Sequence, residues 1–178
     1  MTLSEAPVEI AAYEIREERP GDIAAVRELN RLSFGQDQEA NIVDALRSNG
    51  AALLSLVALS KDRVVGHIMY SPASVADALT GAALGPMAVL PDHQRRGIGS
   101  KLVEEGSRRL TDLGCPFIIV VGHPGFYPRF GFAPASTHGV ISEWELPDDV
   151  FMMVILDRTS MRPISGVAKY RDEFSGVA

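Results

Sequence analysis

The chain has 178 residues, 46% of them hydrophobic, which is enough to build the core of one domain. Its formal net charge of −6 argues against nucleic acid or an anionic membrane as a partner and favours the binding of cationic groups. The single cysteine excludes an intrachain disulfide, and no apolar run approaches the length of a membrane span, so we expect a cytoplasmic protein.

A strand and two helices are predicted first along the chain. Small, polar and aperiodic residues over 1–12 indicate a loose tail. After it we expect a strand over 13–16, a helix from the N-cap Asp22 to about Phe34, and a second helix over 39–47. Asp37 and Glu39 stand at the start of the second helix, where carboxylates are either solvated and favoured by the helix dipole or placed to bind a cationic group.

Apolar segments then predict the first part of a sheet. Strands over 53–59 and 64–70 form an antiparallel hairpin, and a further strand begins after Gly81 and reaches Val89. His67 falls in mid-strand, where we expect a structural histidine held by hydrogen bonds. Since no second ligand stands near it in the sequence, we predict no metal site.

The loop that follows this strand is the main functional signal. Arg95 and Arg96 precede Gly97 and Gly99, and a helical pattern then runs over 98–113. The first amides of a helix lack intrahelical acceptors and carry a partial positive charge, and glycines let a phosphate approach them. The order of residues after Gly99 fits neither a Walker loop nor a dinucleotide fingerprint.

The second half of the chain completes a mixed sheet. An entirely apolar strand over 117–121 is predicted to lie parallel to the strand before the loop, across a helical crossover, and Cys115 at its entrance to be a buried, unreactive thiol. The remaining expectations are a helical turn over 126–130, a strand from 131, a loop over 133–147, a strand over 149–156 and an extension over 158–178 that packs on the domain or stays loose.

The segment Gln94-Arg95-Arg96-Gly97-Ile98-Gly99 resembles the Gln/Arg-x-x-Gly-x-Gly/Ala signature of the GNAT superfamily of N-acetyltransferases. With the later stretch His123-Pro124-Gly125-Phe126-Tyr127-Pro128-Arg129-Phe130-Gly131-Phe132, the chain looks most like the YhbS-like branch of predicted acetyltransferases. The resemblance implies an α/β GNAT fold over residues 13–157, in which helices flank a mixed central sheet and the parallel fourth and fifth strands splay apart.

The resemblance also implies a binding site for acetyl-CoA as cosubstrate. Its pyrophosphate is expected on the loop residues Gln94, Arg95, Arg96, Gly97, Ile98, Gly99 and Ser100. The pantetheine arm is expected to meet backbone groups of Met87, Ala88 and Val89. Tyr127 is expected near the CoA sulfur, and Phe126 is a further cofactor-binding candidate.

Acetyl transfer to an amine needs a general acid for the leaving thiolate and a base for the amine. The resemblance places Tyr127 near the sulfur as the acid; a purely structural aromatic role is the alternative. A phenol of pKa about 10 gives its proton to a thiolate whose conjugate acid lies near 8.5 at a cost of about 2 kcal/mol. His123 is our first candidate for the base, and Glu143 or Glu145 acting through water are the others.

Two features leave alternatives open. Some family members carry a glutamate on the strand before the loop, whereas residues 84–87 here contain no carboxylate. We therefore predict direct attack of a primary amine on acetyl-CoA in a ternary complex, with a non-catalytic acyl-CoA-binding regulatory module as the alternative. A different acyl donor, a protein acceptor and a homodimer paired through edge strands also remain open. Arg129 is expected to pair with a carboxylate or to brace its loop, and not to touch the substrate.

Overall fold

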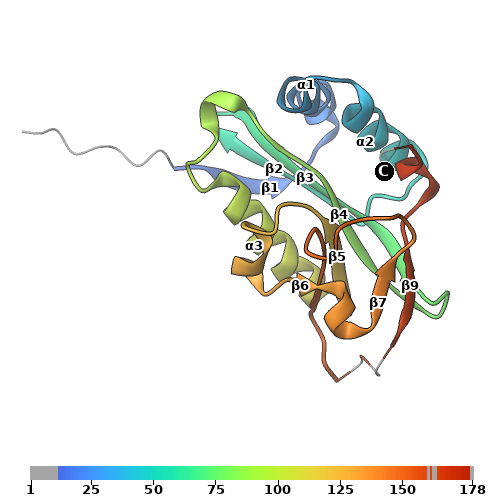
Figure 1. Cartoon of the computed structure of the whole chain (residues 1–178). Helices are drawn as coiled ribbons and strands as arrows, with labels where there is room; N and C mark the ends of the chain where they lie inside the picture. The colour runs from blue at the N-terminus through green and yellow to red at the C-terminus, as the bar shows by residue number, and fades with distance from the viewer. Residues whose placement is uncertain (1–11, 160, 162–163, 177–178) are drawn as a thin grey trace, which may run out of the picture.

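The computed structural model describes residues 12–159, 161 and 164–176 (Figure 1). The tail predicted over 1–12 lies outside this range apart from Ala12. In chain order the elements are β1 (Glu14–Glu17), η1 (Pro20–Asp22), α1 (Ile23–Phe34), α2 (Gln38–Ser48), β2 (Leu54–Ser60), β3 (Arg63–Val75), β4 (Leu79–Val89), η2 (Pro91–His93), α3 (Ile98–Asp112), β5 (Phe117–Val121), η3 (Tyr127–Phe130), β6 (Ala133–Pro134), η4 (Ala135–His138), β7 (Val140–Ser142), β8 (Phe151–Ile155), β9 (Gly166–Lys169) and η5 (Asp172–Phe174), where η marks a short 3-10 turn.

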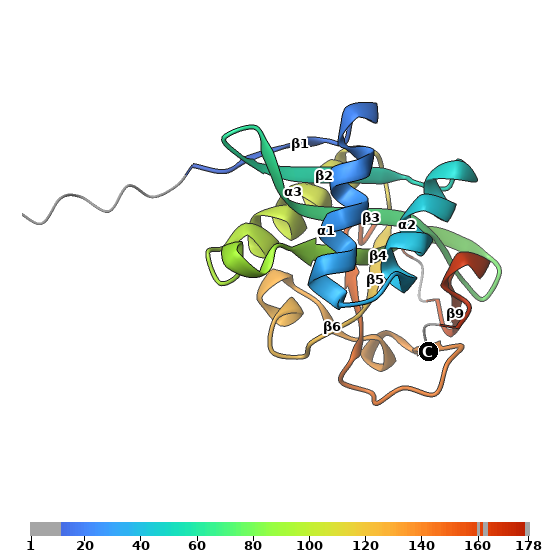
Figure 2. The ribbon, with the colours of Figure 1, turned by 90° about the horizontal axis from the view of Figure 1, so that it is seen from above.

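The strands of the described residues form one mixed sheet. Its main order is β1-β2-β3-β4-β5-β8-β6, and β9 pairs with both β3 and β7. Helices α1 and α2 cover one face and α3 covers the other (Figures 1 and 2). The predicted α/β fold with a parallel β4–β5 pair is confirmed. No helix within the described ranges is long and apolar enough to cross a membrane.

Strands β4 and β5 pair over a short stretch and then separate. Their parallel register joins Ala82 to Ile118 and Ala83 to Ile119. Beyond this point β4 continues along β3 to Val89, while β5 continues along β8. Pro86 lies in the separated part, where it has no N–H to offer a neighbouring strand. The predicted splay of the two parallel strands is therefore present, and it opens toward their carboxyl ends.

The hairpin of β3 and β4 is longer than predicted. Strand β3 continues past Tyr70 to Val75, where a tight turn leads directly into β4. In that turn Ala76 and Asp77 adopt left-handed backbone angles, with φ of 53° and 52°. Neither is a glycine, and the turn therefore carried no strong signal in the sequence.

The predicted loop over 133–147 was wrong in part, because this segment contains β6, η4 and β7. Strand β7 obtains its hydrogen-bond partners from β9, about twenty-five residues further along the chain, in register from Val140 with Gly166 to Ser142 with Ala168. Residues after 158 also add η5, in which Phe174 is buried beneath α2.

Two details at helix ends also differ from the prediction. Asp22 stands directly before α1, but its carboxylate accepts hydrogen bonds from the Arg16 guanidinium at 2.6 Å and from the Arg19 backbone N–H at 2.7 Å, and it makes no cap to the helix. Leu113, expected on the apolar stripe of the helix after the loop, lies just past α3 and is 71% exposed. The stripe itself, including Leu102 and Leu110, is buried as predicted.

Candidate active site

The loop between β4 and α3 exposes the first amides of α3. Arg95 and Gly97 take left-handed backbone angles, with φ of 61° and 82°, and α3 begins directly after Gly97. The Gln94 side-chain amide donates a hydrogen bond to the Val89 carbonyl at 3.0 Å and so ties the loop to the end of β4. The N–H groups from Ile98 onward form the positive end of the helix dipole. This arrangement suits an anionic group such as a phosphate.

A cleft of about 810 Å³ runs along this loop and is called here the loop cleft. Of the residues predicted to form the site, it is lined by Met87, Val89, Gln94, Arg95, Gly97, Ile98, Gly99, Ser100, His123, Phe126 and Tyr127. His93, Gly125 and Arg129 line it as well. Two predicted residues do not: Ala88 points into the core, because neighbouring strand residues face opposite sides, and Arg96 is exposed to solvent.

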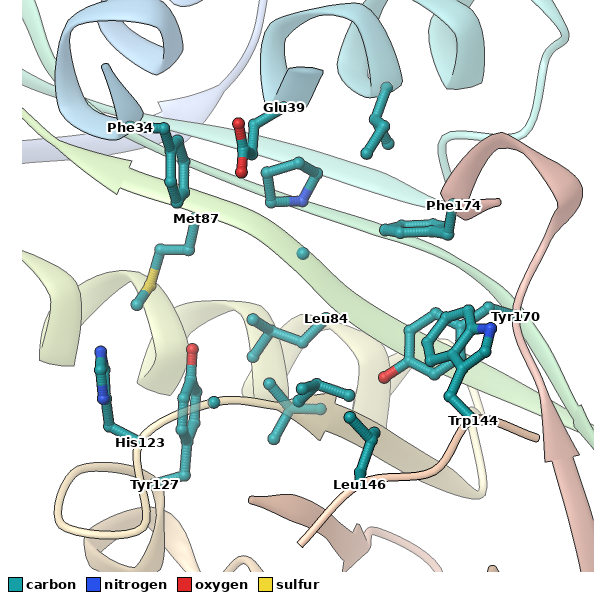
Figure 3. Close-up of a pocket in the computed structure, with 16 residues that line it drawn as sticks. Phe34, Glu39, Leu84, Met87, His123, Tyr127, Trp144, Leu146, Tyr170 and Phe174 are labelled. Atoms are coloured by element: carbon teal, nitrogen blue, oxygen red, sulfur yellow. The ribbon is translucent and has the colours of Figure 1, made fainter. Parts of the chain in front are cut away.

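A second, more apolar cavity of about 340 Å³ opens where β4 and β5 separate (Figure 3). We call it the apolar cavity; it is lined by Phe34, Glu39, Ile42, Leu84, Gly85, Pro86, Met87, Val120, Val121, Gly122, His123, Tyr127, Trp144, Leu146, Tyr170 and Phe174. Met87, His123 and Tyr127 line both cavities. Two substrates bound one in each cavity would therefore meet at these three residues.

Tyr127 combines a buried ring with a hydroxyl that faces the apolar cavity (Figure 3). The ring packs edge-on against Phe126 and Phe132, with centroids 5.0 and 5.5 Å away. It also lies on Gly122, where an added Cβ would be 2.3 Å from Tyr127 Cε2. Burial raises the pKa of Tyr127 to about 12. The packing of the ring fits the structural aromatic role, while the position of the hydroxyl is compatible with the predicted role as general acid.

His123 is the predicted base that borders both cavities. It follows β5, is exposed, and stands beside Tyr127 in Figure 3. Glu143 instead accepts a hydrogen bond from the Tyr170 backbone N–H at 2.8 Å. Neither Glu143 nor Glu145 is among the described residues that line the two cavities.

Glu39 is the carboxylate that faces the apolar cavity, from the first turn of α2 (Figure 3). Its two oxygens each accept a hydrogen bond from the neutral Gln36 amide at 3.1 Å. Asp37, the other acidic candidate of this segment, is exposed and does not line either cavity. Glu39 thus stands in the first turn of α2 and also lines the apolar cavity, so both interpretations of this acid stay open.

Three other side chains have structural roles. The Cys115 thiol is half-buried and donates to the Phe117 carbonyl at 3.3 Å, and burial raises its pKa, in keeping with an unreactive thiol. Arg129 places its guanidinium 4.7 Å from the centroid of the Phe126 ring and donates to that residue's carbonyl at 3.3 Å, so it braces its own loop. His67 is fully buried and hydrogen-bonded at both ring nitrogens, as predicted.

Residues 23–132 match the Acetyltransferase (GNAT) family. YhbS of Escherichia coli K12, an uncharacterized N-acetyltransferase, is 31% identical over 163 residues, which span 90% of this chain and 98% of YhbS. The chain belongs to the GNAT family of acetyltransferases. The resemblance to this superfamily and to its YhbS-like branch is thereby confirmed.

Solved structures of GNAT proteins agree with this assignment. The crystal structure of E. coli YhbS in complex with CoA superposes with a TM-score of 0.88 at 30% identity and covers 93% of each chain. A GNAT acetyltransferase from Brucella melitensis, in complex with acetyl-CoA, gives a TM-score of 0.78 at 34% identity and covers 93% of this chain and 99% of its own. The first of these relatives thus binds CoA and the second binds acetyl-CoA.

Proposed function

We propose that this GNAT protein transfers the acetyl group of acetyl-CoA to a primary amine by direct attack in a ternary complex. The observation that carries the proposal is the meeting of the loop cleft and the apolar cavity at Met87, His123 and Tyr127. One cavity suits an anionic, elongated donor and the other a small acceptor with an apolar body. The complexes of YhbS with CoA and of the B. melitensis relative with acetyl-CoA support the identity of the donor.

The residues of the loop cleft fit the donor. The space in front of Gly97 is open, since a Cβ built there meets no atom within 4 Å, and a phosphate can approach the backbone. Arg95 supplies a cation at the same place. At Gly99 an added Cβ would be 3.6 Å from Phe126 and 3.8 Å from Met87, so these two side chains line the cleft beside the loop and offer apolar contacts to a pantetheine arm.

The residues at the junction then have the following roles. Acetyl-CoA supplies an activated thioester, in which the C–S bond breaks as the C–N bond forms. His123 takes a proton from the amine, directly or through water, and the Tyr127 hydroxyl gives a proton to the leaving sulfur. A backbone N–H of β4 near Val89 donates a hydrogen bond to the carbonyl oxygen as it gains charge.

Burial of Tyr127 changes the energetics of the proton transfer. With a pKa of about 12 against about 8.5 for a free thiol, complete transfer is uphill by about 5 kcal/mol, more than the 2 kcal/mol of an unperturbed phenol. The sulfur stands in the same poorly hydrated place, which raises the pKa of its thiol as well and narrows this gap. Proton transfer is therefore expected to accompany C–S cleavage and not to precede it.

Calorimetric titration with acetyl-CoA and with CoA tests the donor half, and thiol release over a panel of amines tests the transfer. We expect both ligands to bind and at least one small primary amine to release thiol. Absence of binding even at high ligand concentration would refute the proposal, because the protein would then have no site for the donor. Binding without thiol release on any amine would favour a regulatory acyl-CoA-binding module, which the absence of a carboxylate at residues 84–87 also favours.

Tyr127→Phe separates these two outcomes, because it removes the hydroxyl and keeps the ring in its aromatic packing. We expect kcat to fall by about 10²- to 10⁴-fold, while the Kd for acetyl-CoA stays within a factor of about two. Unchanged kcat would remove Tyr127 from the mechanism. Equal urea unfolding midpoints of the two proteins exclude a folding defect.

A further inference from the structure

The far end of the apolar cavity, away from Tyr127, is an aromatic wall formed by Trp144, Tyr170 and Phe174 (Figure 3). The Trp144 and Tyr170 rings lie 4.7 Å apart with planes tilted by 34°, and the Phe174 ring stands 5.2 Å from that of Tyr170. The Tyr170 backbone is held by Glu143. The wall offers flat apolar faces to whatever occupies the cavity.

The Tyr170 hydroxyl has no described hydrogen-bond partner although its oxygen is shielded from solvent. In Figure 3 it points from the aromatic wall into the apolar cavity. Burial raises the pKa of this phenol, which therefore keeps its proton and remains both donor and acceptor. An unpartnered buried hydroxyl is destabilising, and a bound group that hydrogen-bonds to it removes this penalty.

The opposite end of the cavity has a different character. Glu39 faces it with a carboxylate whose described partner is the neutral Gln36 amide, so its charge is available to a cation. The walls between the two ends are apolar side chains such as Leu84 and Val120. An acceptor that fits is cationic at one end, apolar in the middle and able to hydrogen-bond at the other end.

The geometry points to an acceptor that is a primary amine joined by a short apolar linker to one aromatic ring, with a hydroxyl on the ring that hydrogen-bonds to Tyr170. This inference names the acceptor class of the function proposed above and rests on it. Glu39 attracts the ammonium group toward the junction, and Trp144 contacts the ring. Polyamines lack the apolar body, and acidic peptides carry the wrong charge.

Tyramine and phenethylamine are suitable probes, because they differ by the ring hydroxyl alone. The chain contains one tryptophan, Trp144, and its fluorescence therefore reports occupancy of the cavity without any turnover. Each amine is titrated against the full chain with CoA in excess, using excitation that selects tryptophan. We expect tyramine to bind about tenfold more tightly than phenethylamine, the value of one hydrogen bond.

Tyr170→Phe is expected to remove this preference and to leave the Kd for phenethylamine unchanged. Tyr70→Phe is the matched control, since it also deletes a buried hydroxyl without a described partner but outside both cavities, and it keeps the preference for tyramine. Glu39→Gln is expected to raise the Kd for both amines by a similar factor and so to leave the ratio of the two Kd values unchanged.

An unchanged ratio of the Kd values for phenethylamine and tyramine in Tyr170→Phe would overturn the inference, because it would show that the Tyr170 hydroxyl does not bind the ring hydroxyl. The absence of any change in Trp144 fluorescence on adding either amine would overturn it as well. These outcomes differ from a failure of the proposed function. Thiol release on other amines without a Trp144 response to tyramine would leave the transferase in place and remove its aromatic acceptor. Tyramine binding that depends on Tyr170 but gives no thiol release would leave the aromatic binding site in place and remove the proposed acetyl transfer.

Discussion

Acidification is expected to destabilise this protein through His67, which is completely buried in mid-sheet. The Asn30 side-chain amide donates to the Val26 carbonyl at 3.0 Å and approaches His67 Nδ1 at 3.4 Å, so Nδ1 is the acceptor. His67 Nε2–H then donates to the Ser55 hydroxyl at 2.9 Å, and that hydroxyl donates to Glu18. These bonds satisfy the neutral ring and leave no place for a second proton.

Burial, followed by the positive charge of Arg47, lowers the pKa of His67 from 6.5 to about 3. The Glu18 carboxylate lies 3.8 Å from Nε2, but it is already engaged by Arg47 and Ser55. Between about pH 6.5 and 3 the unfolded chain binds a proton here that the folded chain does not. The contribution of His67 to the free energy of unfolding is therefore complete above this pH range. It is lost as the pH falls through the range, and the loss reaches roughly 3 kcal/mol at about pH 4.

Urea unfolding of the wild type and of His67→Gln at a series of pH values measures this contribution. At neutral pH the free energy of unfolding of the variant is expected to be about 1–2 kcal/mol lower than that of the wild type, because glutamine packs imperfectly in this place. Between neutral pH and pH 4 the free energy of unfolding of the variant is expected to fall by roughly 3 kcal/mol less than that of the wild type. Other groups, such as Glu105 and Glu173 with pKa lowered to about 2 by their arginine partners, affect both proteins equally. Parallel stability curves for the two proteins would refute the reasoning, as would an inflection near pH 6.5 in the NMR signals of the His67 ring.

Two further changes test the site. Gly122→Ala places a Cβ 2.3 Å from the Tyr127 ring and is expected to lower kcat by about 10²-fold, with a small effect on the affinity for acetyl-CoA. Gly21→Ala is the control, because no atom lies within 4 Å of its Cβ, and it is expected to leave kcat unchanged. Equal kcat in both variants would show that the position of Tyr127 is unimportant. Arg95→Ala is expected to raise the calorimetric Kd for acetyl-CoA about tenfold, because Arg95 lines the loop cleft. Arg108→Ala is the control, since Arg108 lies on α3 and pairs with a carboxylate of its own helix, and it is expected to leave this Kd unchanged. Equal increases in Kd would indicate that Arg95 attracts acetyl-CoA through its charge at long range and not by direct contact.

The loop and its helix could be predicted because their signals are local. Gly97 and Gly99 stand where a strand gives way to a helix, and this order is itself the architecture of an anion site. Neighbouring residues in the chain form this feature, so a short stretch of sequence contains the information. Tyr127 also lies within a few residues of the end of β5, but it was singled out by the resemblance to GNAT proteins and not by a local pattern.

The aromatic wall could not be predicted in this way. The sequence predicts a loop around Trp144 and an extension of undetermined role around Tyr170, because neither segment has a periodic pattern of its own. They meet because β9 pairs with β3 and β7, and these contacts join parts of the chain that are far apart. Glu39 was identified as a candidate from its place at a helix start, but only the spatial position of α2 distinguishes it from Asp37.

The loop cleft is built from one continuous stretch, roughly residues 87–129, whereas the apolar cavity collects side chains from Phe34 to Phe174. Substitutions outside this stretch, directly after β9 and in η5, can therefore reshape the apolar cavity and leave the loop cleft intact. Two GNAT proteins with the same loop can thus differ in their apolar cavities, and under the proposed function each needs its own acceptor determined.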